Sequence, residues 1–267
     1  MTSAALLAEA VRTTAGPLLV LTGAGISLAS GIPTFRGRDP GAVWASNLMA
    51  RATLEHFQRD PADSWAWYRQ RHAGVVAAEP NAAHRALVTL EQWQAARGAR
   101  MRLVTQNIDL LHEAAGSRSV IKVHGSIDRA RCADPRCPAA ESTVPTSTLD
   151  FAAFEARPDA GTVPRCPACG DLMRPHVLWF DEHYGSHPDY CWSEVLDTCD
   201  TMRLAIAIGT SFSVGVTDLI SSAARQRGVP LFIVDPQAPS IDGRHVVGIR
   251  EPAEDLLPRV CALLGAA

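Results

Sequence analysis

Apolar runs alternate with helix-like stretches along the chain, and this alternation predicts a parallel sheet covered by helices. A short apolar run bounded by glycine or proline is typical of a strand buried on both faces. Such runs occupy residues 18–21, 101–105, 119–123, 204–208 and 231–234. Stretches with helical spacing lie beside them at 3–15, 82–96 and 216–227. We therefore expect an α/β fold built on a Rossmann-like, doubly wound parallel sheet.

Two regions break the alternation and are predicted to be inserts carried on the sheet. Residues 35–80 are rich in tryptophan, arginine and helix-like spacing, whereas residues 130–180 hold four cysteines and many prolines but little periodicity. The 267 residues are expected to form one domain whose large lobe lies at about 1–34, 81–125 and 183–267. A helical insert at about 35–80 and a small, strand-poor module at about 126–182 complete the predicted organisation.

The composition is that of an ordinary globular protein and narrows the function only by exclusion. Hydrophobic residues make up 47% and charged residues 20% of the chain, which excludes a disordered or coiled-coil protein. The net charge of −3 provides no basic field, so neither nucleic acid nor a membrane is expected as a partner. We also expect no membrane span and no signal peptide. Seven cysteines, an odd count, favour a cytoplasmic location, where thiols stay reduced.

Four of the cysteines form two close pairs with the spacing of a metal site. Cys132 and Cys137 are spaced C-x4-C, Cys166 and Cys169 are spaced C-x2-C, and 28 residues separate the two pairs. Two such pairs in a strand-poor insert match a zinc ion with four thiolate ligands, which has no open position and is therefore structural. The alternatives are buried free thiols or a redox C-x2-C motif, but the strand–helix–strand context of a redox motif is missing at this pair.

A glycine-rich turn follows the first predicted strand. Gly23-Ala24-Gly25-Ile26-Ser27 precedes a predicted helix, where backbone N–H groups and the helix N-terminus can approach a pyrophosphate. The spacing to Gly31 departs from the usual G-x-G-x-x-G, and a tight strand–helix turn is the alternative. Two later strand ends favour a nucleotide. Gly209-Thr210-Ser211 supplies small and hydroxyl side chains, and Asp235 supplies a carboxylate suited to a ribose diol.

Polar residues also follow two other predicted strands. Gln106, Asn107 and Asp109 supply carboxamide and carboxylate groups that suit a nicotinamide amide and its ribose, or else a helix-capping loop. His124 closes the run at 119–123, where a neutral imidazole can accept a hydroxyl proton near pH 7. A structural histidine is the alternative, and Gly125 beside it is expected to leave room for a substrate.

Taken together and in order, these motifs resemble those of the sirtuins, the NAD-dependent protein lysine deacylases, and in particular their bacterial members. The resemblance covers the chain from about residue 16 to residue 264, and the ordered set is far more specific than any one motif. It rests on the glycine turn, Gly31-Ile32-Pro33-Thr34-Phe35-Arg36-Gly37, Thr105-Gln106-Asn107-Ile108-Asp109, His124-Gly125, the two cysteine pairs and Gly209-Thr210-Ser211.

The resemblance implies an enzyme that consumes NAD as a co-substrate and carries one structural zinc ion. In the family, the acyl-lysine carbonyl oxygen attacks C1′ of the nicotinamide ribose, and nicotinamide leaves. The expected catalytic residues are Asn107 and His124, with His124 as general base on a ribose hydroxyl, and the products are free lysine, nicotinamide and O-acyl-ADP-ribose. The expected cofactor contacts are Gly23, Ala24, Gly25, Ser27, Thr34, Phe35, Arg36, Trp44, Gln106, Asn107, Asp109, Gly209, Thr210, Ser211, Asp235 and Ala253. The expected zinc ligands are Cys132, Cys137, Cys166 and Cys169.

Residues 174–182 resemble the family's substrate segment, which pairs with the acylated peptide through backbone hydrogen bonds. Val177, Trp179 and Phe180 are therefore expected to contact the substrate, which is an acylated lysine side chain of another protein. Asp181 stands where the family usually has glycine and is expected to alter the mouth of the lysine tunnel. Asp235 stands where many members have asparagine, and a carboxylate there argues against NADP because it would face the 2′-phosphate.

A Y-x-x-R motif in the helical insert indicates which type of acyl group the protein can bind. Tyr68 and Arg71 resemble the pair that binds acidic acyl groups in the desuccinylase and demalonylase branch. An arginine can fork onto a carboxylate while a tyrosine hydroxyl donates a further hydrogen bond. A surface helix with a solvated, arginine-rich face is the alternative. Deacetylation is compatible with the pair, because a smaller acyl group still fits.

Two other functions compete with deacylation. NAD hydrolysis or ADP-ribosyl transfer on the same fold would use the same NAD motifs, but His124 and the peptide-binding segment favour deacylation. A non-enzymatic nucleotide-sensing or zinc-ribbon module would be expected to have lost Asn107, Asp109 or His124, and all three are present.

Overall fold

Among the described residues, 1–34, 48–212, 215–238 and 245–266, six strands form the larger sheet of this computed structural model, and all pair in parallel. They are β1 (Leu18–Thr22), β2 (Met101–Thr105), β3 (Val120–Lys122), β7 (Leu204–Ile208), β8 (Leu231–Val234) and β9 (Val246–Ile249). Their order, β3-β2-β1-β7-β8-β9, is that of a doubly wound fold whose two halves diverge between β1 and β7. The predicted fold class is confirmed, and β9 adds a strand that was not predicted.

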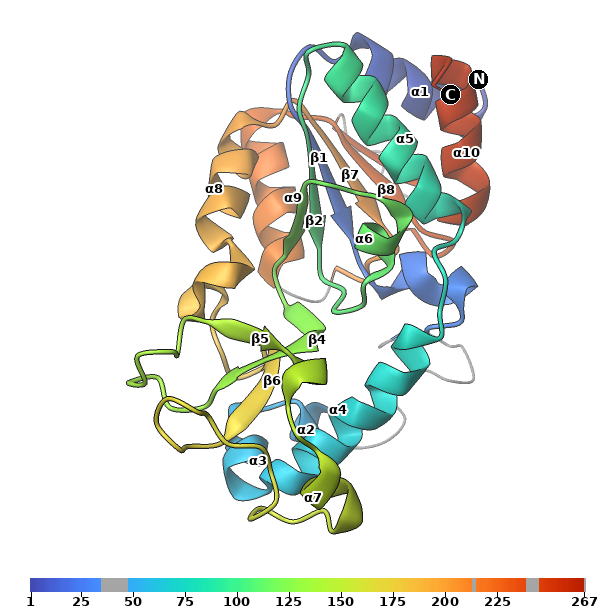
Figure 1. The fold of residues 1–267 in the computed structure, drawn as a ribbon. Helices are drawn as coiled ribbons and strands as arrows, with labels where there is room; N and C mark the ends of the chain where they lie inside the picture. Colours follow the sequence, from blue (N-terminus) through green and yellow to red (C-terminus); the bar gives the residue numbers. More distant parts are fainter. Residues whose placement is uncertain (35–47, 213–214, 239–244, 267) are drawn as a thin grey trace.

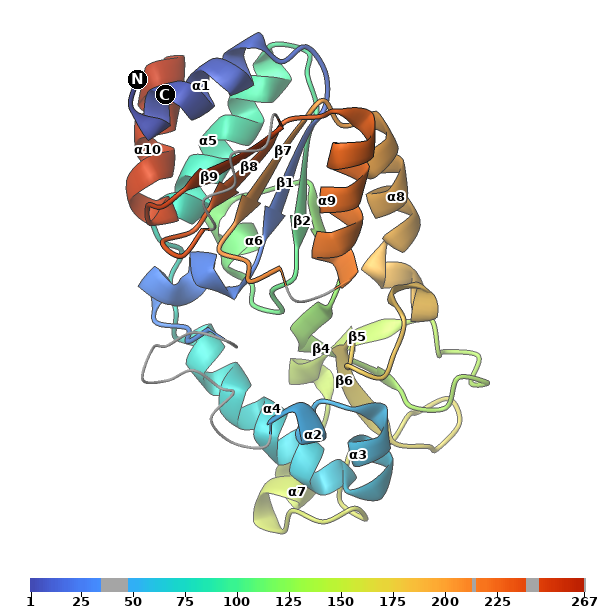
Figure 2. The same ribbon diagram turned by 180° about the vertical axis from the view of Figure 1, so that it is seen from behind.

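Helices cover both faces of this sheet (Figures 1 and 2). One face carries α1 (Ser3–Thr13), α5 (Ala82–Ala96) and α10 (Ala253–Leu264), and the other carries α8 (Trp192–Thr201) and α9 (Gly215–Arg227). Because successive side chains of a strand point to opposite faces, Leu18 and Val20 join the core on the α1 side, whereas Leu19 and Leu21 join the core on the α9 side. Burial on both faces explains why the strands read as continuous apolar runs.

A second, antiparallel sheet of three strands lies in the region predicted to be poor in strands, so that expectation is wrong. Its order is β5 (Thr143–Pro145), β4 (Gly125–Cys132) and β6 (Met173–Val177). The sequence did not predict these strands for two reasons. The register shifts between Gly125 and Ala130, which breaks the alternation of β4. In addition, Arg131 and Arg174 point inward to a buried carboxylate, so positions of the buried face read as polar.

The described helices of the 35–80 region pack against this second sheet (Figure 2). They are α2 (Leu48–Arg51), α3 (Leu54–Arg59) and α4 (Pro61–Val76), and α7 (Ala152–Ala156) lies beside them. Phe57, Trp65 and Tyr68 share one buried cluster with Met173 and Trp179. The two regions read as separate inserts therefore have a common hydrophobic core, below the carboxyl ends of the parallel strands.

Two local features differ from the sequence expectations or extend them. The glycine turn is followed by a 3-10 helix, η1 (Ala24–Ser30), rather than an α-helix, and further 3-10 turns are η3 (Thr146–Thr148), η4 (Tyr184–Ser186) and η5 (Pro188–Tyr190). A short helix, α6 (Leu111–Ala115), follows β2.

Within the described part of the chain, no helix is both long and apolar enough to cross a membrane.

Candidate active site

A cavity of about 1240 Å³ lies where the parallel strands end, between the large sheet and the second layer. Residues predicted to be catalytic, to bind the cofactor and to bind the substrate line this cavity together. They are Gly23, Ala24, Gly25, Thr34, Tyr68, Arg71, Gln106, Asn107, His124, Val177, Trp179, Phe180, Gly209, Thr210, Ser211, Asp235 and Ala253. Phe35, Arg36 and Trp44 lie outside the described residues. The carboxyl edge of a doubly wound sheet is where such folds bind ligands.

The glycines of the two loops over this edge are required by the contact between the loops. The amide of Gly25 donates to the Gly209 carbonyl at 2.9 Å, and the amide of Gly23 donates to the Ile208 carbonyl at 3.0 Å. A Cβ on Gly25 would lie 2.7 Å from Gly209 Cα, and Gly209 has a left-handed φ of 59°. These two amides are therefore committed to protein carbonyls. The glycines allow the close approach of the backbones rather than supplying those amides to a phosphate.

Asn107 is held by Ser27 and, through Ser27, by Asp109, and neither of these two residues lines the cavity. Its Nδ2 donates to Ser27 Oγ and to the Gly23 carbonyl, both at 3.1 Å. Ser27 Oγ in turn donates to Asp109 Oδ2 at 2.9 Å, and Asp109 Oδ1 accepts from the Leu111 amide at 3.1 Å. Neither Ser27 nor Asp109 is among the residues that line the cavity, and their contact with the cofactor stays a prediction. Asp109 also caps the start of α6.

His124 lies at the junction of the two layers with a defined tautomer. Its Nδ1 is 2.8 Å from the Gln106 carbonyl oxygen, so Nδ1 carries the proton and Nε2 is left as the acceptor. Burial lowers the pKa of His124 to about 4, against the opposing effect of the Gln106 hydrogen bond. The imidazole is therefore neutral at pH 7, as a general base must be.

Gly125 does not leave room for a substrate, so that expectation is wrong. Its φ is 78°, and a Cβ there would lie 2.2 Å from the His176 carbonyl oxygen and 3.1 Å from the Tyr190 ring. It lets the chain leave β3 of the first sheet and enter β4 at short range from β6.

The predicted acyl-binding pair comes from α4 and lines the cavity beside the substrate segment. The Tyr68 hydroxyl accepts a hydrogen bond from Trp179 Nε1 at 2.8 Å, and burial raises the pKa of Tyr68, so the hydroxyl keeps its proton for donation. The Arg71 guanidinium lies 4.0 Å from the centre of the Trp67 ring. Burial lowers the pKa of Arg71, but an arginine stays charged at neutral pH. The pair is therefore not on a solvated helix face.

A buried ion pair shapes the substrate segment. Glu182 accepts from both ends of the Arg174 guanidinium at 2.7 Å and from Arg131 at 3.2 Å. It also accepts from the Trp179 amide at 3.0 Å, and the Arg174 guanidinium lies 3.6 Å from the centre of the Trp179 ring. Next to it, Asp181 accepts from the first two amides of α3, at 2.7 and 3.1 Å. The segment is thus tied to both β6 and the helical region.

The four predicted zinc ligands come together although they are far apart in sequence. Their sulfur atoms all lie within 4.8 Å of one another, with Cys132 Sγ 3.4 Å from Cys169 Sγ and Cys137 Sγ 3.8 Å from Cys166 Sγ. Tetrahedral zinc with Zn–S bonds of about 2.3 Å places its sulfurs about 3.8 Å apart. The four thiols therefore fit one tetrahedral zinc ion.

A second group of potential metal ligands has unsuitable surroundings. His176, His187 and Asp189 also offer ligand atoms within 4.8 Å of one another. The pKa of His176 is lowered to about 2, mainly by burial and then by His187, Arg131 and Arg174. Positive charge that disfavours an imidazolium also disfavours a cation. Among the described residues we therefore assign metal binding to the four cysteines.

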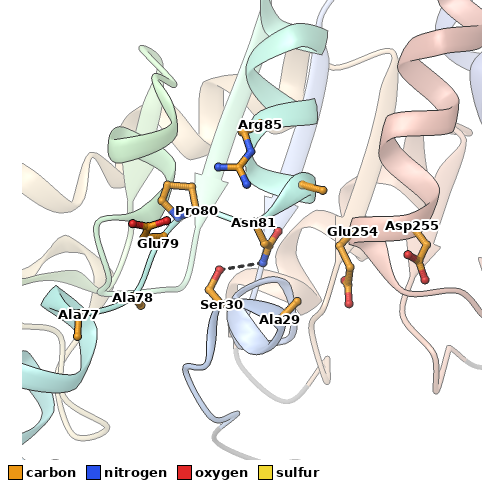
Figure 3. A pocket seen from close by; sticks show the side chains of 11 residues that line it. Ala29, Ser30, Ala77, Ala78, Glu79, Pro80, Asn81, Arg85, Glu254 and Asp255 are labelled. Carbon is orange, nitrogen blue, oxygen red and sulfur yellow. Dashed lines mark hydrogen bonds between the residues drawn. The ribbon is translucent and has the colours of Figure 1, made fainter.

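A further hollow of about 600 Å³ lies at the start of α5 and α10 and shares Glu254 with the larger cavity (Figure 3). Its polar lining includes Glu79, Arg85, Glu254 and Asp255. Asn81 Nδ2 donates to Ser30 Oγ there at 3.0 Å, which fastens η1 to the start of α5. This lining contains neither a histidine nor a cysteine, so the candidate chemistry belongs to the larger cavity.

Sequence reasoning missed the aromatic residues Trp67, Tyr184 and Phe212 of the site, and Tyr184 is the one that contacts His124. Tyr184 lines the cavity and stacks on His124, with ring centroids 5.7 Å apart. Because it belongs to a short 3-10 turn outside every recognised motif, only the folded structure reveals this contact.

The strand order, the cavity at the sheet edge and the four-thiol cluster define an α/β nucleotide-binding protein with a structural metal module. The Sir2 family pattern matches residues 23–216. The chain belongs to the Sir2 family. It is 39% identical over 250 residues to the NAD-dependent protein deacylase 1 of Pseudomonas aeruginosa, covering 91% of this chain and 92% of that protein. The NAD-dependent protein deacylase of Aeropyrum pernix is 37% identical over 248 residues, with 92% of each chain covered.

Solved structures agree with the family assignment. A Sir2 homologue mutant in complex with ADP-ribose has a TM-score of 0.79 at 30% identity, with 100% of this chain and 99% of that chain covered. A Sir2 homologue in complex with NAD has a TM-score of 0.76 at 32% identity, with 97% and 94% covered.

Proposed function

We propose that this protein is an NAD-dependent protein lysine deacylase that releases nicotinamide and O-acyl-ADP-ribose. One observation carries the proposal: His124 lines the same cavity as Asn107, the crossed glycine loops and the substrate segment. The relatives named as NAD-dependent deacylases and the Sir2 structures solved with NAD or ADP-ribose support it.

The proposed roles divide along the cavity. The crossed loops and Asp235 hold the adenosine diphosphate side of NAD, and the carboxamides of Gln106 and Asn107 hold the nicotinamide ribose. His124 Nε2 accepts the proton of a ribose hydroxyl after nicotinamide has left. Positive charge builds on the ribose as the glycosidic bond breaks, so excluding water from the cavity favours the reaction with the acyl oxygen.

The substrate is an acylated lysine of another protein, whose backbone pairs with the segment around Val177 and Trp179. Lys122 is the chain's single lysine. Its Nζ lies 3.1 Å from Glu113 and also donates to the Asp109 carbonyl, so it is already bound within the fold. We place the protein in the cytoplasm, where reduced thiols would bind zinc. That ion would cross-link the second layer and take no part in the reaction.

Tyr68 and Arg71 support a capacity to bind an acidic acyl group. Both line the cavity beside Trp179, and the partly buried guanidinium would gain more from a carboxylate than an exposed one would. We therefore propose desuccinylation or demalonylation alongside deacetylation.

The test is incubation of the purified protein with NAD and an acetyl-lysine or succinyl-lysine peptide, followed by mass spectrometry. Deacylated peptide and O-acyl-ADP-ribose should appear together, and His124→Ala should abolish both. Nicotinamide released equally without peptide would instead indicate an NAD hydrolase. NAD binding without turnover would indicate a nucleotide-sensing module.

A further inference from the structure

Tyr184 is clamped between the candidate catalytic base and a second aromatic ring. Its ring stacks on His124, with centroids 5.7 Å apart and planes at 24°. On Trp192 it stacks at 4.2 Å and 13°. The Tyr184 side chain therefore has little freedom to rotate, and it covers one face of the imidazole within the cavity.

The Tyr184 hydroxyl links the base to the start of a helix. It accepts a hydrogen bond from the Val216 amide at 3.3 Å, in the first turn of α9. It lies 3.4 Å from His124 Nε2. Because Val216 supplies a proton to the hydroxyl oxygen, the hydroxyl's own hydrogen is available for Nε2. The positive end of the helix strengthens a donor placed in this way. Both ring nitrogens of His124 then have a defined partner, Gln106 for Nδ1 and Tyr184 for Nε2.

We propose that Tyr184 is the positioning residue for His124, holding Nε2 toward the ribose site and shielding the imidazole face from water. This inference rests on the proposed deacylase function. In the reaction, the ribose hydroxyl takes the place of the Tyr184 hydroxyl at Nε2 and gives up its proton there. The Tyr184 hydroxyl keeps its hydrogen bond to Val216 and is neither consumed nor ionised.

The proposal predicts how removal of Tyr184 changes the pH dependence. Burial holds the pKa of His124 at about 4. Loss of the ring admits water, and loss of the hydroxyl removes a donor to the neutral form, so both raise the pKa toward the ordinary value of about 6.5. Among the described residues, the charged groups that line the same cavity are Arg71 from α4, Glu182 after β6, Asp218 and Arg225 from α9, Asp235 after β8, and Glu254 from α10. None of them is changed in the variants, so the shift reports on Tyr184.

The experiment compares the kcat of Tyr184→Phe, Tyr184→Ala and the wild type between pH 5.5 and pH 8, with saturating NAD and acyl peptide. The wild type should keep nearly the same kcat at both pH values. Tyr184→Ala should lose about tenfold in kcat at pH 8. It should lose up to about tenfold more at pH 5.5 as its imidazole becomes protonated. Tyr184→Phe, which keeps the stacking, should show a smaller loss in the same direction, and KM for NAD should change little.

Tyr190→Phe is the matched control. Tyr190 is a buried tyrosine six residues away that stacks on His176 and does not line the cavity. Its pH profile should match the wild type. The inference is overturned if the Tyr184 variants lose activity by the same factor at every pH, and Tyr184→Phe decides alone if the alanine variant does not fold. An inactive wild type would overturn the proposed function instead, so the two failures are distinguishable.

Discussion

Replacing Glu182 by glutamine should destabilise the protein strongly, because it removes the charge that two buried arginines share. The side chains of Arg174 and Glu182 are only 4% and 8% exposed, and Arg131 is 8% exposed. Removing one partner of a buried ion pair costs about 3–5 kcal/mol, since the remaining charge has lost both water and its counter-ion. For a protein of this size, 1 kcal/mol shifts the melting temperature by about 2–4 °C. The expected fall in melting temperature is therefore roughly 6–20 °C.

A matched surface pair provides the control for this measurement. Glu9 and Arg12 form an ion pair whose side chains are 52% and 47% exposed. Exposed pairs contribute about 0–1 kcal/mol, so Glu9→Gln should change the melting temperature by only a few degrees. Calorimetry or dye-monitored melting at one pH and salt concentration gives both values. If Glu182→Gln melts no lower than Glu9→Gln, the buried pair does not support the substrate segment as argued.

Three further changes separate the roles assigned to the second layer. Arg71→Met should lower kcat/KM for a succinyl-lysine peptide about 10–100-fold, the worth of a hydrogen bond to a charged group, while deacetylation changes little. Arg69→Met is its control because Arg69 pairs with Glu155 outside the cavity, and equal losses with both peptides would refute the acyl assignment. Cys166→Ser should lower the bound zinc measured by mass spectrometry and the melting temperature, whereas Cys191→Ser, outside the thiol cluster, should retain a full zinc equivalent. Asp181→Gly should lower the free energy of unfolding by about 0.5–2 kcal/mol, because it removes the side chain that caps α3, and it should raise KM for the peptide. An unchanged KM would show that this cap does not affect substrate binding.

The parallel sheet could be predicted from sequence because burial on both faces leaves an unmixed apolar signal. The prediction for β2 (101–105) and for β7 (204–208) coincides with the structure, as does that for β8 (231–234). The antiparallel sheet carries the opposite signal. Arg131 and Arg174 occupy buried positions in β4 and β6, and the carboxylate of Glu182, which is distant in sequence from Arg131, neutralises their charge there. No local pattern can report a partner that folding brings in.

The candidate site shows the same division between local and distant signals. The cysteine pairs could be predicted as one cluster because zinc ligand spacing is a local pattern. The role of Gly25 could not be predicted. A side chain at this position would clash with the backbone of Gly209, which comes from the other half of the sheet. Likewise, the hydrogen bond between Asp109 and Ser27 could not be predicted, because the two residues follow different strands. A polar side chain at a strand end indicates the right edge of the sheet without indicating which group it faces.

The position of His124 explains how one cavity can order two substrates. Its side chain is bound to the Gln106 carbonyl of the large sheet, while its own carbonyl accepts from the Leu178 amide of the substrate segment at 3.0 Å. Only Val123 and His124 separate β3 of the first sheet from β4 of the second. A displacement of either layer must therefore move the imidazole relative to one of these partners. Residues that hold this junction, above all Tyr184, should consequently affect kcat more than the binding of either substrate alone.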